Sequence, residues 1–349
     1  GRTGHGYTEE PDSIARQLEA SGSHVLHHRT GLWYERRRND HERNMQADSE
    51  VWAPFNEYPY SRSGTGEAQD RLSKYDLNKF NPWYWYRLKQ FVDLADKKNL
   101  LLWHDHYNQH NIIEEGAHWC DYPWRSANNI NNLGFPEKTL AEQFYDITRP
   151  VIRKYHQLFI RQSVNTFHDN NGVIHSIGME YTGPLHFMKF WLEEIASCPN
   201  HQLVALTATK DVQDAVLQDS LYNKMVDIID IRQWHYRNDG SLYEPQGGCS
   251  LAPRQWARLI DPGTTSCESI YRAVYEYRSR YPEKAVTYNA AMPRNVEGNA
   301  ANWAVFMAGG SLAKVPPIEA MDVYTLASEF QPVASLTESN RQWVMGKAQ

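Results

Sequence analysis

The sequence has few cysteines, and none of them belongs to a paired motif. The four are Cys120, Cys198, Cys249 and Cys267. No two have the C-x-x-C spacing of a zinc ribbon, which excludes that class of protein. A disulfide between Cys249 and Cys267 in an oxidising compartment and free buried thiols are both compatible with the sequence, which does not choose between them.

The chain also lacks strongly basic and long apolar segments. Its 349 residues carry a formal net charge of −6, and the longest basic run is Arg36-Arg37-Arg38. Nucleic-acid binding is therefore poorly supported. No apolar segment approaches the roughly 20 residues of a membrane span, so no membrane partner is expected. No G-x-G-x-x-G motif follows a first strand, which disfavours a dinucleotide-binding fold.

Length and composition fit a large folded unit. The length suits one large α/β barrel or two domains. Hydrophobic residues make up 41% of the chain, enough for a sizeable core, and the 22% of charged residues argues against disorder. The opening residues, GRTGHGYTEE, carry no signal-peptide pattern and resemble the middle of a protein. We therefore expect the sequence to be a fragment of a longer chain.

Aromatic residues are abundant, at 13% of the chain with 12 Trp and 21 Tyr. Such side chains pair a flat apolar face with a polar edge, which suits stacking on sugar rings. The same side chains also suit the margins of a large core. Composition leaves these two explanations open.

Short apolar runs alternate with helical patterns along most of the chain. We number the runs as strands 2 to 8: HVLHH, NLLLWHD, HSIGME, LVALTAT, DIIDIRQWH, AVTYN and the region WAVFMAGG, which also fits a helix. Helical patterns cover 14–21, 82–98, 140–167, 185–198, 212–225 and 267–283, with Pro150 expected to kink or divide the third. Apolar runs alternating with helices predict a parallel sheet buried on both faces. Length and strand number favour an α/β protein with a (β/α)8 TIM barrel, a single domain over residues 1–349 whose first strand lies before residue 1 or is replaced.

Polar or aromatic residues follow the predicted strands. They are His27, His28 and Arg29 with Trp33 and Tyr34, then His104, Asp105 and His106, then Glu180 and Tyr181, then Gln233, Trp234 and His235, then Tyr288 and Asn289, and finally Lys314. In a barrel of this kind the chemistry takes place at the carboxyl ends of the strands. The pattern therefore predicts a functional site at that end.

Two carboxylates are the candidate catalytic groups. Glu180 ends a run that should be interior, and a carboxylic acid in an aromatic-lined pocket can keep its proton near neutral pH, as a general acid requires. A salt bridge between Glu180 and Arg29 is the structural alternative. Asp105 lies between two histidines and is either a second catalytic carboxylate or a group that orients an imidazole.

The histidines permit a metal site. His104 and His106 are two residues apart and so share a face of a strand, and Glu180 and His235 would complete the ligand set. Lys314 stands where an acidic residue would be expected after strand 8, which argues against a metal. We favour hydrogen bonding to substrate hydroxyls, with no metal and no cofactor.

A long segment after strand 3 mixes aromatic planes with amides. It contains Trp119, Tyr122, Trp124, Arg125, Asn128, Asn129, Asn131 and Asn132. This mixture suits a carbohydrate site, and it equally suits a structured loop packed on the barrel rim in which asparagines form turns.

The chain resembles a known group of proteins. The motifs GLWYERRRNDHE, WHDHYNQHNIIEEGAHWCDYPWRSANNINNLGFPE, GMEYTGP and WAVFMAGG look like the barrel of uncharacterised polysaccharide-degrading proteins of gut and marine Bacteroidetes. The barrel is more distantly similar to retaining glycoside hydrolases with an acid/base Glu after strand 4 and a nucleophile Glu after strand 7. The resemblance implies that Glu180 is the acid/base. At strand 7 it fails, because Asn289 stands there and the nearest carboxylate, Glu297, lies eight residues on.

The sequence thus predicts an exo-acting glycoside hydrolase of a plant or algal polysaccharide, located in the bacterial periplasm or outside the cell. Its partner would be an oligosaccharide or polysaccharide. Glu180 would be the general acid and Asp105 the nucleophile or base, with Glu297 in reserve. The substrate-binding residues would be Arg29, Trp33, His104, His106, Trp119, Tyr181, Trp234, His235, Tyr288 and Asn289. A metal-dependent hydrolase and a carbohydrate-binding protein without catalysis remain the alternatives.

Overall fold

The computed structural model describes residues 10–30, 58–109, 112, 119, 122–136, 141–245, 263–293, 300–314, 330–332 and 345–347. The chain divides into two compact units. Unit 1 comprises Gly1–Val204 and Gln246–Ala257, and unit 2 comprises Ala205–Pro245 and Arg258–Gln349. The division falls within strand β6. One barrel domain over residues 1–349 stays a prediction.

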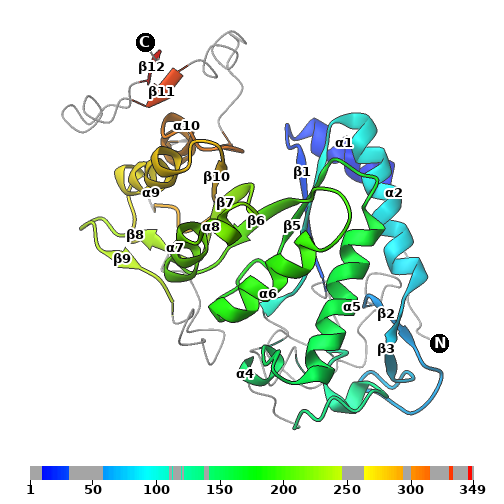
Figure 1. Ribbon diagram of the computed structural model, residues 1–349. Helices are drawn as coiled ribbons and strands as arrows, with labels where there is room; N and C mark the ends of the chain where they lie inside the picture. Colours follow the sequence, from blue (N-terminus) through cyan, green and yellow to red (C-terminus); the bar gives the residue numbers. More distant parts are fainter. Residues whose placement is uncertain are drawn as a thin grey trace. The chain divides into compact units, whose positions relative to one another are not determined.

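The described elements alternate between strands and helices (Figure 1). The strands are β1 (Val25–Arg29), β2 (Tyr60–Arg62), β3 (Tyr75–Phe80), β4 (Leu101–Asp105), β5 (Val173–Ser176), β6 (Leu203–Thr207), β7 (Ile228–Ile231), β8 (His235–Tyr236), β9 (Leu242–Tyr243), β10 (Ala285–Tyr288), β11 (Phe330–Pro332) and β12 (Met345–Lys347). The α-helices are α1 (Pro11–Ala20), α2 (Pro82–Lys98), α4 (Ala141–Phe144), α5 (Pro150–Thr166), α6 (Leu185–Ala196), α7 (Lys210–Gln218), α8 (Ser220–Asn223), α9 (Cys267–Arg280) and α10 (Ala300–Met307). A short 3₁₀ helix, η2, covers Ser126–Asn128.

The main sheet has six strands in the order β1-β4-β5-β6-β7-β10. Neighbouring strands within each unit run parallel. All six overlap with predicted strands 2 to 7, which are confirmed as strands, but β5 ends at Ser176, so the predicted end of strand 4 at Glu180 was wrong. Each strand lies beside the next one in this set, without the reversal of order that marks a doubly wound sheet. This winding is the one found in a (β/α)8 barrel, of which the described residues provide six strands. Closure by eight strands stays a prediction.

The region WAVFMAGG was expected to be strand 8 or a helix. The strand assignment was wrong, and the region belongs to helix α10 and the turn after it. Its alanine-rich sequence has high helix propensity. Gly309 ends the helix with φ +80°, and the Gly310 N–H donates to the Val305 carbonyl at 2.8 Å, which closes a Schellman motif. The chain then returns beside β10, where the Ser311 N–H donates to the Val286 carbonyl at 2.6 Å.

Pro150 divides the helix predicted over 140–167. The structure has α4 before it and α5 beginning at Pro150, which occupies the first helical turn. Proline suits this position because its missing N–H would have no helical partner there. Arg149 is accordingly extended, with φ −80° and ψ 114°.

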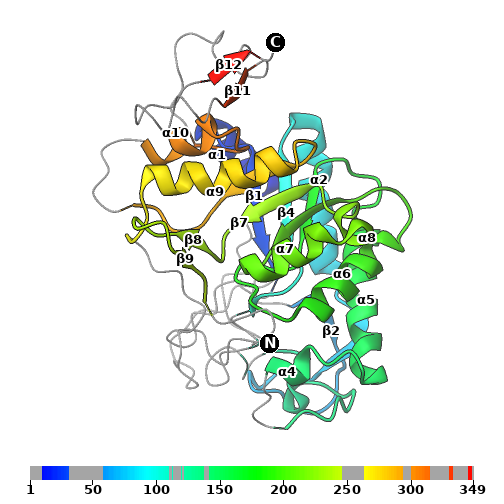
Figure 2. The same ribbon diagram turned by 60° about the vertical axis from the view of Figure 1, so that its left-hand side comes forward.

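Helices α2, α5 and α6 lie beside the strands of unit 1 (Figures 1 and 2). The start of α2 is fixed by the Asn81 side chain, which accepts hydrogen bonds from the Trp83 and Tyr84 amides. The apolar side chains of α2 recur at helical spacing and are buried: Tyr84, Trp85, Leu88, Phe91, Val92 and Ala95. This stripe holds the helix against the sheet.

In unit 2, helix α7 is tied to the strands by one buried amide. The Gln213 side chain donates to the carbonyls of Leu206 in β6 and Asp230 in β7, both at 2.8 Å. Helix α9 packs against β7, β10 and α10. Helices α7 and α9 thus cover one face of β6, β7 and β10. The other face of these strands carries a different set of polar side chains.

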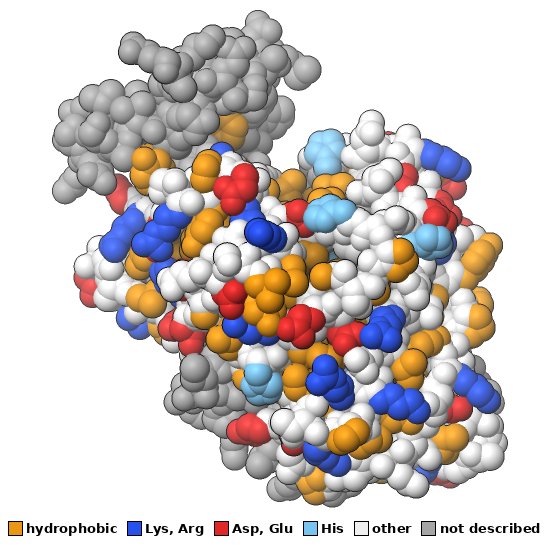
Figure 3. All heavy atoms as spheres, in the orientation of Figure 1, with side chains coloured by type: hydrophobic (Ala, Val, Ile, Leu, Met, Phe, Trp, Pro, Cys, Tyr) orange, Lys and Arg blue, Asp and Glu red, His pale blue; other side chains and the backbone are white. Residues whose placement is uncertain are grey.

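Two further expectations concern the surface and the cysteines. No helix among the described residues is long and apolar enough to cross a membrane. Over the face in Figure 3, Lys and Arg side chains alternate with Asp and Glu side chains. Cys198 and Cys267 are free thiols, which leaves the disulfide alternative without support.

Candidate functional site

In unit 1, the main-sheet strands β1, β4 and β5 present two chemically different faces. Successive side chains of a strand point to opposite faces. His104 in β4 contacts Trp85 of α2 and Phe167 at the end of α5, with ring centroids 6.2 and 5.4 Å away. The His104 face therefore packs on the helices, and the adjacent Asp105 belongs to the other face.

The helix-facing side holds a layer of four fully buried imidazoles, His28, His104, His106 and His175. The Nδ1 atoms of His28 and His104 are 2.9 Å apart, and Nε2 of His106 is 2.9 Å from Nδ1 of His175. Burial lowers the pKa of His28 to about 3 and of His175 to about 4, and it holds the pKa values of the other two well below their usual range. All four are neutral at ordinary pH.

The hydrogen bonds of His106 fix its tautomer. The indole N–H of Trp191 in α6 donates to its Nδ1 at 3.2 Å, and an indole nitrogen can only donate. The proton of neutral His106 is therefore on Nε2, from which it is donated to His175 Nδ1. His104 and His106 were predicted to bind sugar hydroxyls. Their burial against helices argues for a packing role instead, since both nitrogens of His106 are already engaged.

The opposite face carries a polar row at the carboxyl ends of the strands. In the strand register, Arg29 of β1 pairs with Asp105 of β4, and Asp105 pairs with Ser176 of β5. Asp105 and Ser176 are fully buried, whereas Arg29 is half-buried. Ser176 was not among the predicted residues, although its place in the register could have been read from strand alternation.

Glu180 lies in a turn four residues after the end of β5. The chain before it is held against the segment after β4, where the Tyr107 N–H donates to the Ile177 carbonyl at 2.9 Å. Gly178 is required there, because a Cβ atom would lie 2.5 Å from the Tyr107 carbonyl oxygen. Glu180 is half-buried, and it follows the strand next to the one that ends in Asp105.

Tyr181 anchors the chain after Glu180. Its ring is 1% exposed, and its hydroxyl donates to the Pro184 carbonyl at 2.9 Å. Tyr181 was predicted to bind sugar, and the structure instead gives it a packing role that fixes the backbone beside Glu180. Trp119 is likewise buried, with 1% exposure, among aromatic rings that include Tyr122 and Phe135.

The aromatic and amide segment of residues 122–132 is packed, as its structural alternative predicted. Trp124 is fully buried, and its indole donates to the Tyr60 hydroxyl at 2.9 Å. The Asn128 side chain donates to the Tyr122 carbonyl, and that of Asn129 donates to the carbonyls of Pro123 and Arg125. The side-chain amides of these two asparagines therefore stabilise turns of the segment.

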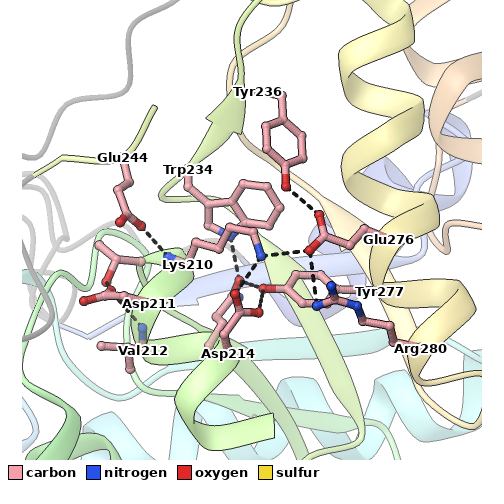
Figure 4. A network of polar contacts seen from close by, with 12 residues as sticks. Lys210, Asp211, Val212, Asp214, Trp234, Tyr236, Glu244, Glu276, Tyr277 and Arg280 are labelled. Atoms are coloured by element: carbon pink, nitrogen blue, oxygen red, sulfur yellow. Dashed lines mark hydrogen bonds and ion pairs between the residues drawn. The ribbon is translucent and has the colours of Figure 1, made fainter. Parts of the chain in front are cut away.

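In unit 2, Trp234 is a core residue. Its indole donates to Gln213 at 2.7 Å. Its ring lies 5.1 Å from the Lys210 ammonium, and Figure 4 shows these two side chains next to each other. Lys210 also pairs with Asp214 at 2.7 Å and Glu276 at 3.0 Å. Trp234 was predicted to bind sugar, but with 0% exposure it packs against this network instead.

His235 and Tyr288 are also committed within the protein. His235 is fully buried, with Nε2 2.9 Å from the Thr264 hydroxyl. The Tyr288 hydroxyl donates to the Ala291 carbonyl at 2.8 Å, and burial raises the pKa of Tyr288. Both side chains were predicted to bind substrate, but in the structure both are buried and hydrogen-bonded within the protein.

Asn289 is the exposed member of a polar cluster in unit 2. Its side-chain amide donates to Asp230 at 2.7 Å, at the carboxyl end of β10. Asp230 was missed in the sequence because one aspartate inside the apolar run IIDI does not stand out. The signal that could have identified it is a charged residue within an apolar strand, flanked on both sides by isoleucines that point to the other face of the sheet.

Three predicted positions need separate mention. Trp33 and Glu297 lie outside the described residues, and Lys314 is exposed. Among the side chains that the structure describes, no group of three or more His, Cys, Asp or Glu is arranged to hold a metal ion.

The parallel sheet, its flanking helices and the polar residues at the carboxyl ends of its strands define an α/β protein of the kind that places ligand sites at that edge. The chain belongs to the family described as "Domain of unknown function (DUF6298)", whose model matches residues 1–330. No curated protein matches the chain.

Solved structures similar to this chain include two described as glycoside hydrolases and one described as an endoglucanase. A glycoside hydrolase family 5 protein from Bacteroides vulgatus is 12% identical with a TM-score of 0.44, and the match covers 86% of this chain and 54% of that protein. A protein described as "Glycoside hydrolase" is 13% identical with a TM-score of 0.42, covering 88% and 57%. The endoglucanase Cel5A of Pseudomonas stutzeri is 12% identical with a TM-score of 0.38, covering 85% and 72%. The chain thus spans little more than half the length of the first two.

Proposed function

We propose that the protein is a glycoside hydrolase in which Glu180 is the general acid and Asp105 the second carboxylate. The observation that carries the proposal is the placement of these two side chains. Asp105 ends β4 on the face away from the helices, and Glu180 follows the neighbouring strand β5 at the same carboxyl edge. Two carboxylates flanking one bond are the usual catalytic pair of glycosidases.

The proposal gives the two groups different protonation states. Asp105 is ionised in it, as a nucleophile or a base must be, and Glu180 keeps its proton, as a general acid must. Arg29 is the register neighbour of Asp105 across β1 and β4, and Tyr181, which follows Glu180 in the chain, is fully buried.

The finer parts of the proposal rest on the sequence resemblance. They are exo-action, a plant or algal polysaccharide as substrate, and a periplasmic or extracellular location. Glu297 stays in the proposal as the reserve second carboxylate.

The first experiment identifies a substrate and then tests the acid. Plant and algal oligosaccharides are screened for released monosaccharide by chromatography. On a cleaved glycan, Glu180→Gln should lower kcat by about 10²–10⁴, the usual contribution of a general acid. On an aryl glycoside of the same sugar with a dinitrophenolate leaving group, the loss should be small, because that group departs without a proton.

Controls separate chemistry from folding. Asp105→Asn should abolish cleavage of both substrates, because a better leaving group removes the need for a general acid but not the need for the second carboxylate. Glu19→Gln removes an exposed carboxylate paired with Lys98 on α2 and should leave kcat unchanged. Full activity of Glu180→Gln on the natural glycan would refute the assignment. The anomeric form of the first product, read by NMR, then decides between retention and inversion.

Asn289 at the end of β10 favours one alternative, a carbohydrate-binding protein without catalysis. An amide there cannot act as a nucleophile. Calorimetric binding of a glycan with no released product from any substrate would support that alternative over the enzyme.

A further inference from the structure

Asp230 in unit 2 is a fully buried carboxylate that accepts hydrogen bonds from four side chains. Oδ1 accepts from the Thr287 hydroxyl at 2.8 Å and from the Asn289 amide at 2.7 Å. Oδ2 accepts from the Thr207 hydroxyl at 3.0 Å and from Arg232 Nε at 2.7 Å. The donors come from β6 and β10 and from the residues after β7 and β10, so Asp230 joins three strand ends.

This arrangement decides which end of the Asn289 amide faces outward. A carboxylate can only accept hydrogen bonds, so the amide must turn its nitrogen toward Asp230. The Asn289 oxygen then points away from Asp230, and it makes no hydrogen bond with any described residue. Asn289 is exposed although the carboxylate that orients it is buried.

We infer that Asp230 is a positioning residue that fixes Asn289 Oδ1 as an acceptor for a hydroxyl group of a carbohydrate. The choice of carbohydrate as ligand rests on the proposed function. The polarity of the contact does not, because an oriented amide oxygen selects hydrogen-bond donors whatever carries them. Replacing Asp230 by asparagine would supply a donor at that point, which lets the Asn289 amide turn over and present its nitrogen instead.

The test measures binding in a chain that cannot cleave. The full chain carrying Glu180→Gln is titrated with D-galactose, D-xylose, L-rhamnose and sodium D-galacturonate, and Kd is read from NMR shifts. Asp230→Asn and Asn289→Ala should each weaken the bound sugar about fivefold, which corresponds to ~1 kcal/mol for one neutral hydrogen bond. The double variant should bind no more weakly than Asn289→Ala alone, because Asp230 acts through Asn289.

Thr207→Val is the matched control. It removes a different donor to Asp230 and leaves the Asn289 contact in place, so it should leave Kd unchanged. If Asp230→Asn does not fold, the side-chain amide protons of Asn289 give a second measurement in the parent. The Asn289 side-chain proton that is donated to Asp230 should exchange with solvent more slowly than the side-chain protons of other exposed asparagines. Its NMR signal should shift when the sugar binds.

Three results would overturn the inference: no sugar binds, the two single variants add in the double variant, or Thr207→Val weakens binding as much as Asp230→Asn. The second and third results are independent of the enzyme assignment, whereas the first also counts against it. Binding through Asn289 in a protein that cleaves no glycan would sustain the inference and refute the proposed hydrolase. Cleavage that does not depend on Asn289 would do the reverse.

Discussion

Replacing His156 by glutamine should make the stability of the protein less sensitive to acid. His156 in α5 is fully buried. Its Nε2 donates to the Phe144 carbonyl at 2.8 Å, which leaves Nδ1 to accept from the Tyr107 hydroxyl at 2.9 Å. Its ring stacks on Trp124 with centroids 4.5 Å apart. Burial lowers the pKa of His156 to about 3.

The sign follows from the two pKa values. The folded pKa lies below the unfolded value of about 6.5, so the unfolded chain binds more protons in the interval between them. The free energy of unfolding therefore falls as the pH is lowered through this interval. At pH 5 the loss from His156 is ~2 kcal/mol, from ~1.4 kcal/mol for each pH unit below 6.5. The other buried histidines contribute in the same interval, but they do so alike in the parent and in a variant of His156, so the difference between the two isolates His156.

The assay is urea unfolding of the parent and His156→Gln between pH 5 and pH 8. Glutamine keeps one donor and one acceptor for the two partners and does not titrate. The loss of unfolding free energy between pH 7 and pH 5 should be smaller in the variant by ~2 kcal/mol. His168→Gln, which removes a half-exposed imidazole, is the control for losing a histidine. An unchanged pH dependence in His156→Gln would show that His156 is not held neutral by burial.

Three further outcomes are expected. Lys210→Met should lower the unfolding free energy by about 1–3 kcal/mol, because it leaves the half-buried Asp214 without its cation, whereas Glu276 keeps its ion pair with Arg280. Lys89→Met, at an exposed ion pair, should cost at most about 1 kcal/mol, and equal losses in urea unfolding would contradict this. Gly178→Ala should lower glycan cleavage through displacement of Glu180, since the added methyl meets the Tyr107 carbonyl, and unchanged kcat would contradict it. Treatment with EDTA should leave cleavage unchanged, because the histidine pair first considered for a metal faces the helices.

The sheet could be predicted because its strands are short, continuous apolar runs between clear helical patterns. WAVFMAGG could not be assigned, because a short apolar run suits a buried helix and a buried strand equally. The candidate carboxylates were found from their position after a strand. The packing of the histidines against the helices was not predicted. The spacing in His104-Asp105-His106 shows that the two imidazoles share a face, but it does not show which face meets the helices. That choice is made by Trp85 and Trp191, which are distant in sequence.

The imidazole layer between sheet and helices has a consequence for how this sequence can vary. His28 and His104 share one hydrogen bond, and His106 accepts from Trp191 and donates to His175, so each of these contacts depends on where a proton sits. Replacing His106 by phenylalanine alone would preserve the ring shape but leave the Trp191 N–H and His175 Nδ1 without partners inside the core. Relatives that lose one histidine of the layer should therefore also have changed the partner residues, and these positions should covary as a group.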